Sequence, residues 1–182
     1  MIVALDNTFL SLILNPLTVP TPNPDTGKPI DHCQQRIEAL IDTHSKRGDV
    51  VLIPTPCFSE LLTAVPDMGK AIGEINKSIA FSLASFDARC AIDLADEVRK
   101  AINNGDKKSG VKAGWQEIKF DRQIAVIAKV GGAEVFYTDD RNQSQFATQL
   151  GMTVKHTWEL DLPPEYAQME LIGDTKGPKK PA

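Results

Sequence analysis

Acidic side chains stand at positions in this sequence where they could act together at one site. They are Asp6, Glu60, Asp121 and the neighbouring pair Asp139-Asp140. Asp6 and the pair come directly after apolar runs that are typical of buried strands. Glu60 and Asp121 belong to the first turns of expected helices. Carboxylates that share one site raise each other's pKa unless a cation lies between them.

A divalent cation would compensate such a cluster, and its chemistry is specific. Mg²⁺ and Mn²⁺ prefer oxygen ligands, and Mg²⁺ combines a few carboxylates with water and substrate phosphate. The bound ion turns water into a nucleophile and neutralises charge that develops on a phosphodiester. The acids therefore predict metal-assisted phosphoryl chemistry with one or two Mg²⁺ or Mn²⁺ ions.

The elements that position these acids alternate between strand and helix. Apolar runs predict strands at 2–5, 50–53, 79–83, 133–138 and 152–155. Helices are expected at 8–14, 32–46, 57–65, 68–77, 88–104, 121–130 and 142–150. Asp31 and Asp87 are the expected N-caps of two of these helices, and Asp121 opens a third. The alternation predicts a three-layer α/β/α fold around a parallel five-stranded sheet, in which ligands bind beyond the carboxyl ends of the strands.

Length and composition set the class of protein. The chain has 182 residues, of which 42% are hydrophobic and 24% charged, as in an ordinary globular domain. We expect this domain to span residues 1–160, followed by a C-terminal extension at 161–182 that is flexible from about residue 173. The net charge of −4 argues against a protein whose whole surface is basic and binds nucleic acid, but it is compatible with a local basic patch that binds a nucleic-acid substrate.

Cysteines, histidines and apolar stretches exclude several other classes. The three cysteines lack any CxxC spacing, which predicts reduced or buried thiols in a cytoplasmic protein. The three histidines are scattered, which argues against a zinc site. No apolar stretch is long enough to span a bilayer, so we expect no membrane partner.

A basic segment at residues 99–122 surrounds the third acid, with seven basic side chains against three acidic ones. Lysines and arginines of this kind position phosphates, although a solvated helix end and loop explain the segment equally well. The candidates for substrate binding are Lys107, Lys108, Lys112, Lys119, Arg122 and Arg141. Trp115 is expected to anchor the loop rather than to stack on a base.

The order and spacing of these motifs resemble those of PIN-domain nucleases, and specifically the VapC-like toxin ribonucleases. Asp6-Asn7-Thr8 resembles the first acid motif, and residues 51–54 followed by Glu60 resemble the second. The octapeptide DRQIAVIA, which begins at Asp121, resembles the pattern D-x-x-I-A-x-x-A. It is followed by Gly132, Val135, Thr138 and Asp140, which resemble the family's glycine and a strand ending in T-x-D. The resemblance covers residues 1–156.

The resemblance implies a sheet order of 3-2-1-4-5 and a set of site residues. The metal-binding, catalytic acids would be Asp6, Glu60, Asp121 and Asp140, and the residues that orient carboxylates or water would be Thr8 and Thr138. Whether Asp139 or Asp140 faces the metal stays open, and the spacing favours Asp140. The family's Asp-Phe after this motif is replaced by Asn142-Gln143, and the proline-rich connection at 15–29 is unusually long. These departures bear on substrate choice.

These observations predict a Mg²⁺- or Mn²⁺-dependent endoribonuclease, the toxin of a toxin–antitoxin pair. Its partners would be an RNA substrate, an antitoxin that covers the acidic groove, and a second copy of the chain in a homodimer. Two alternatives are a PIN-fold nuclease in RNA processing and a non-catalytic PIN-fold module that binds protein. A receiver-like phosphoacceptor domain is disfavoured, because Pro54 stands where the acceptor aspartate would follow a central strand.

Overall fold

Short runs of consecutive apolar residues form the sheet, because a parallel strand is buried on both of its faces. The computed structural model describes residues 1–15, 17–164 and 166. Its strands are β1 (Ile2–Leu5), β2 (Val50–Pro54), β3 (Phe81–Ala84), β4 (Val135–Tyr137) and β5 (Thr153–Lys155). All pairings are parallel, and the order is β3-β2-β1-β4-β5. The expected sheet and its order are confirmed.

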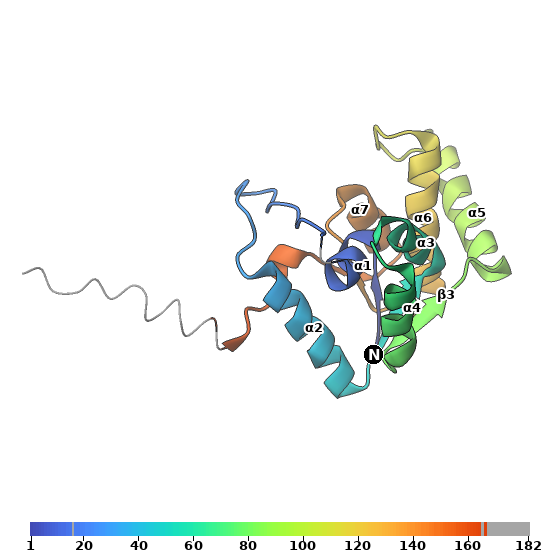
Figure 1. Cartoon of the computed structure of the whole chain (residues 1–182). Helices are drawn as coiled ribbons and strands as arrows, with labels where there is room; N and C mark the ends of the chain where they lie inside the picture. Colours follow the sequence, from blue (N-terminus) through green and yellow to red (C-terminus); the bar gives the residue numbers. More distant parts are fainter. Residues whose placement is uncertain (16, 165, 167–182) are drawn as a thin grey trace, which may run out of the picture.

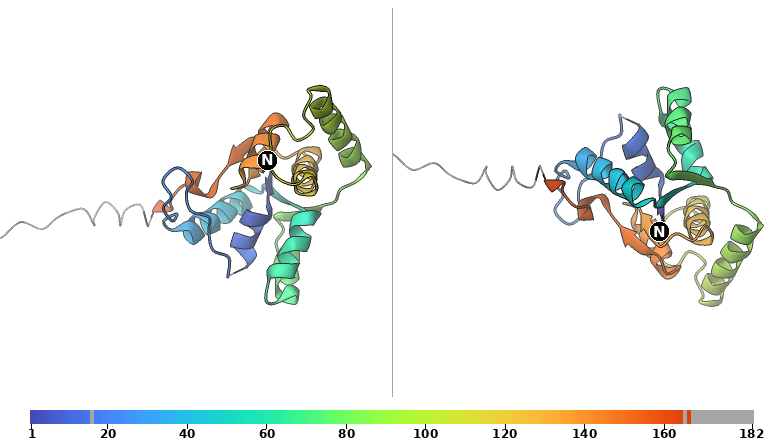
Figure 2. Two further views of the ribbon diagram at one scale, coloured as in Figure 1. Left: turned by 90° about the horizontal axis from the view of Figure 1, so that it is seen from above. Right: turned by 90° about the horizontal axis from the view of Figure 1, so that it is seen from below.

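Helices cover both faces of this sheet. They are α1 (Asn7–Leu14), α2 (Cys33–Arg47), α3 (Thr55–Ala64), α4 (Met68–Lys77), α5 (Ala88–Asn103), α6 (Trp115–Val130) and α7 (Arg141–Gln149), followed by the 3₁₀ turn η1 (Thr157–Glu159). The labelled view places α2 and α5 at opposite sides of the molecule (Figure 1). Figure 2 shows α1 and α2 on one side of the sheet and α5 and α6 on the other. This is the expected three-layer α/β/α arrangement.

A topological switch point lies beside β1, because the later strands are added first on one side of it and then on the other. Successive crossovers lead from β1 through β2 to β3 on one side, whereas β4 and β5 lie on the other. Val3 pairs with Val51 of β2 and with Val135 of β4. Open α/β sheets bind ligands at the carboxyl ends of the strands where the order reverses. In this chain that place is the junction between the ends of β1 and β4.

The core lies between β1, β2 and the inner face of α6. Val3, Ala4 and Leu5 are fully buried, and every residue of α6 from 124 to 128 is buried against the sheet. The helix ends at Gly131, where an added Cβ would lie 2.3 Å from the Cδ1 atom of Leu52. Close packing at this point holds α6 against β2 and so sets the position of its first turns above the carboxyl edge of the sheet.

Two residues expected to begin or cap a helix do not do so. α6 begins at Trp115 rather than at Asp121, so Asp121 lies in its second turn and caps nothing. Burial of Ile118 against the core extends this helix into a segment whose lysines and glycines are typical of a loop. α2 begins after His32, which has a left-handed backbone and no capping side chain, so Asp31 is not its N-cap. Asp87 caps α5 as expected, accepting a hydrogen bond from the backbone N–H of Cys90 at 2.9 Å.

The expected extension at 161–182 lies largely outside the described residues, and the flexible part from residue 173 lies entirely outside them. Among the helices that are described, none combines the length and the apolar character that crossing a membrane requires.

Candidate active site

Asp6 is the most deeply buried acid of the chain's candidate set, and β1 delivers it to the switch point. Its side chain is 1% exposed and caps α1, accepting a hydrogen bond from the backbone N–H of Phe9 at 2.8 Å. Burial raises the pKa of Asp6 to about 7, against the hydrogen bonds from Thr138 and Phe9, which lower it. The nearby charges of Asp139 and Asp140 raise the pKa further.

Thr138 joins the ends of β1 and β4. Its fully buried hydroxyl donates to Oδ2 of Asp6 at 2.6 Å and accepts from the backbone N–H of Asp140 at 3.0 Å. These contacts fix the orientation of the Asp6 carboxylate relative to the loop that carries Asp140, in line with the orienting role expected of Thr138. Thr8 lies partly buried in the first turn of α1, and its role stays a prediction.

Asp121 and Glu60 approach the same edge from helices on opposite sides of the sheet. α6 packs against β2 and its last residues lead into the start of β4, so its first turns lie toward the carboxyl edge of the sheet. The pKa of Asp121 is raised to about 6, first by burial and then by the charges of Asp140, Glu117 and Glu60. The pKa of Glu60, on α3, is raised by burial. Asp121 and Asp140 both accept hydrogen bonds from Gln143, so these two carboxylates are neighbours, whereas the charge of Glu60 acts on Asp121 more weakly than those of Asp140 and Glu117.

The two neighbouring aspartates have different surroundings. Both oxygens of Asp139 accept hydrogen bonds from Thr157, one from its backbone N–H at 2.8 Å and one from its hydroxyl at 2.7 Å. Asp140 is exposed and caps α7, accepting from the backbone N–H of Gln143 at 2.7 Å through Oδ1. Asp139 therefore anchors η1, whereas Asp140 keeps an oxygen available and lies close enough to Asp121 to raise its pKa.

Two solved structures share this arrangement of strands and helices. A chain from the crystal structure of VapBC2 from Rickettsia felis, bound to a DNA fragment from their promoter, superposes with a TM-score of 0.55 and 13% identity. The match covers 86% of the present chain and 98% of that chain. A chain from DNA-bound VapBC of Salmonella typhimurium gives a TM-score of 0.51 at 13% identity, covering 86% and 99% of the two chains. The fold is PIN-like.

This likeness is one of fold. No protein-family model and no curated protein matches the chain in sequence. The PIN-like fold is confirmed independently by the sheet order and by the neighbours, and the roles of individual residues rest on the geometry of the site.

Sequence reasoning missed two residues of the site in this PIN-like fold. Glu117, one turn before Asp121 on α6, adds to the negative charge, and its spacing of four residues could have identified it if the start of α6 had been known. Gln143 donates from Nε2 to Oδ1 of Asp121 at 3.2 Å, which lowers the pKa of Asp121. Among buried side-chain polar atoms of the described residues, Oε1 of Gln143 alone has no partner. No local sequence pattern predicts that Gln143 contacts Asp121.

The donor chemistry of the site fits a hard divalent cation. The potential ligands are carboxylate oxygens, and their raised pKa values show the mutual repulsion and desolvation that a cation would relieve. No three His, Cys, Asp or Glu side chains of the described residues are close enough to hold an ion directly. An ion at this site would therefore be held partly through water, as Mg²⁺ usually is.

The basic candidates fall into two groups. Arg122 is 3% exposed, and its guanidinium donates to the backbone oxygen of Lys107 at 2.8 Å and to the hydroxyl of Ser109 at 3.1 Å. It therefore holds the loop between α5 and α6 in place, and its hydrogen bonds are internal. Lys107 lies over the ring of Trp115, 4.5 Å from its centroid, so Trp115 anchors the loop. The exposed candidates are Lys107, Lys112, Lys119 and Arg141. Lys108 is partly buried and donates to the backbone oxygen of Ala113.

The three cysteines are free and buried. Cys57 lies among the acids, and burial followed by the charges of Asp6 and Glu60 raises its thiol pKa well above the ordinary value. A thiol with a raised pKa is a poor nucleophile, which argues against a catalytic role for Cys57.

Proposed function

We propose that this chain is a divalent-metal-dependent endoribonuclease that hydrolyses RNA phosphodiesters, and that it is the toxin of a toxin–antitoxin pair in the cytoplasm. The observation that supports this most strongly is a set of hydrogen bonds at the switch point, in which Thr138 connects Asp6 with Asp140 and Gln143 connects Asp140 with Asp121. Two of these carboxylates have pKa values raised to about 7 and about 6. A fold that keeps destabilising carboxylates together at its ligand-binding edge indicates a use for them.

Asp6, Glu60, Asp121 and Asp140 would hold Mg²⁺ or Mn²⁺, and Thr138 would keep Asp6 oriented toward it. The bound ion would supply an activated water and neutralise charge on the phosphodiester. Asp121 is suited to accept the proton of the attacking water, because a base is most effective when its pKa lies near the working pH. Gln143 orients Asp121 for this task through its amide N–H.

The partner proposals rest on the fold neighbours. Both neighbours are chains of VapBC complexes bound to DNA, so we propose an antitoxin as a protein partner of this chain, together with a homodimer. A basic side chain of the antitoxin would enter the acidic region and take the place of the metal. Size-exclusion chromatography with light scattering measures the dimer directly.

The decisive experiment compares RNA cutting by the wild-type chain and by Asp6→Asn in Mg²⁺, Mn²⁺ and EDTA. Asp67→Asn is the matched control, because Asp67 also caps a helix, accepting from the N–H of Lys70 at 2.9 Å, and asparagine caps equally well. We expect metal-dependent cutting by the wild type and the control, and none by Asp6→Asn. If no RNA is cut and calorimetry detects no Mn²⁺ binding, the nuclease proposal is wrong and a non-catalytic protein-binding module replaces it.

A further inference from the structure

A groove extends from Asp121 along residues that have no role in the chemistry proposed above. Its floor is a small pocket of about 20 Å³ that Asp121 lines together with Val111, Ile118 and Phe146. Toward solvent lies an open hollow of about 500 Å³ between the loop and α7. The two spaces share Ser109, Val111, Asn142 and Gln145 as lining residues, so they form one continuous amide groove. A hollow of this size falls in the range of ligand sites.

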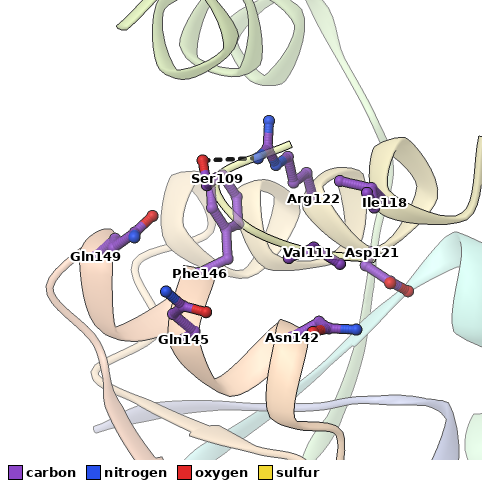
Figure 3. Close-up of a pocket in the computed structure, with 9 residues that line it drawn as sticks. All are labelled: Ser109, Val111, Ile118, Asp121, Arg122, Asn142, Gln145, Phe146 and Gln149. Atoms are coloured by element: carbon purple, nitrogen blue, oxygen red, sulfur yellow. Dashed lines mark hydrogen bonds between the residues drawn. The ribbon is translucent and has the colours of Figure 1, made fainter. Parts of the chain in front are cut away.

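One wall of the amide groove is the loop between α5 and α6, and internal contacts hold it in shape. The buried guanidinium of Arg122 binds this loop by donating a hydrogen bond to the hydroxyl of Ser109, which is the dashed contact in Figure 3. Asp106 accepts hydrogen bonds from the backbone N–H groups of Lys108 at 2.8 Å and of Gly110 at 2.7 Å. The wall is therefore formed before any ligand arrives, which lowers the entropic cost of binding.

The opposite wall is α7, which presents a row of amide side chains. Asn142, Gln145 and Gln149 lie three and four residues apart and so share one face of the helix. In Figure 3 the side chains of Asn142 and Gln145 project from α7 beside the pocket, below the segment that carries Val111. Asn142 lies at the same end of the groove as Asp121 (Figure 3).

Amides above an apolar floor match the chemistry of an unpaired nucleobase. A base needs hydrogen-bond donors and acceptors at its edge and apolar contact at its faces, and each amide offers both a donor and an acceptor. The exposed Lys112 stands on the rim of the same groove, where it can meet the phosphate of the same strand. Uncharged amides that can hydrogen-bond to a base, with a lysine at the rim that can contact phosphate, favour single-stranded RNA as the ligand.

We infer that the amide groove holds an unpaired nucleotide of the RNA next to the scissile phosphate, and that Asn142 and Gln145 read its base. This inference rests on the proposed function, because its argument for RNA uses the continuity of the groove with Asp121. It assigns substrate selection to α7 at the place where the chain departs from the family pattern.

Binding in EDTA tests this inference without requiring cleavage. The probes are fluorescent homopolymers of A, C or U, about ten nucleotides long, which present the same base whatever register the strand adopts. We expect the wild-type chain to prefer one homopolymer by about tenfold, and Asn142→Ala/Gln145→Ala to reduce that preference to about threefold or less. Asn103→Ala/Gln34→Ala, which alters an exposed asparagine and an exposed glutamine outside the groove, is the matched control and should behave as wild type.

Lys112→Ala separates reading of the base from contact with phosphate. It should weaken binding to all three homopolymers alike and reduce the salt dependence of binding, with the preference among bases unchanged. The double alanine variant should do the reverse.

Four results would overturn the inference, and they bear differently on the proposed function. Equal binding of all homopolymers by the wild type contradicts base reading, and so does an unchanged preference in the double variant. If Mg²⁺-dependent cutting is still observed, the nuclease proposal holds in both cases. Absence of both RNA binding and cutting overturns both proposals. Unchanged RNA binding combined with loss of a co-purifying protein partner would assign the groove to protein recognition instead.

Discussion

Replacing Asp6 by asparagine should stabilise the metal-free protein at neutral and alkaline pH while removing the proposed activity. Asp6 is buried, and its pKa rises from 3.8 to about 7 in the folded chain. Asparagine keeps the acceptor for the N–H of Phe9, and its amide can donate to the hydroxyl oxygen of Thr138. The substitution therefore removes a buried charge and retains the local hydrogen bonds.

The sign and size follow from proton linkage. Between the unfolded pKa of 3.8 and the folded pKa of about 7, the folded chain holds a proton at Asp6 that the unfolded chain has lost. Stability must then fall as the pH rises through this interval. A shift of about three pKa units corresponds to about 4 kcal/mol at the upper end. Structural relaxation reduces such costs, so we expect Asp6→Asn to exceed the wild type by about 2–4 kcal/mol near pH 8 and to match it near pH 4.

Urea unfolding followed by circular dichroism in EDTA measures this difference across the pH range, with Asp67→Asn as the control for a capping aspartate. Added Mn²⁺ should stabilise the wild type near pH 8 more than it stabilises Asp6→Asn, because the variant lacks one of the proposed ligands. Equal stability of wild type and Asp6→Asn near pH 8 would refute the reasoning, as would a difference that grows toward acid pH.

Three other perturbations have defined outcomes. Gln143→Leu removes a hydrogen bond that lowers the pKa of Asp121, so the rise of cleavage rate with pH should move to higher pH; an unmoved profile would show that Asp121 is not the base. Tyr137→Phe takes the hydroxyl from Nε2 of His44, a buried contact of 3.0 Å, and should reduce the free energy of unfolding by about 1–3 kcal/mol, measured by urea. Arg122→Met should release the loop between α5 and α6 and accelerate its cleavage by trypsin, whereas an unchanged rate would mean that the guanidinium does not restrain it.

Much of the fold could be predicted because its signals are local. The strand at residues 2–5 is continuously apolar and ends at a carboxylate, so both β1 and the place of Asp6 followed from the sequence. The helix at 68–77 was predicted with its observed bounds. The order of the sheet came from the family resemblance, and the parallel pairings confirm it. These features depend on periodicity and burial, which the sequence expresses within a few residues.

The sequence by itself determined which acids the chain possesses and which strand ends they follow. Tertiary structure decided what each one does. Asp139 accepts hydrogen bonds from Thr157, which η1 places beside the end of β4. Arg122 donates to the backbone of the loop between α5 and α6 and does not extend into solvent. Gln143 meets Asp121 only because α6 and α7 pack side by side. Neighbouring residues with the same chemistry diverge in role because the partner of a polar side chain is chosen by packing between elements distant in sequence, and no local pattern encodes that choice.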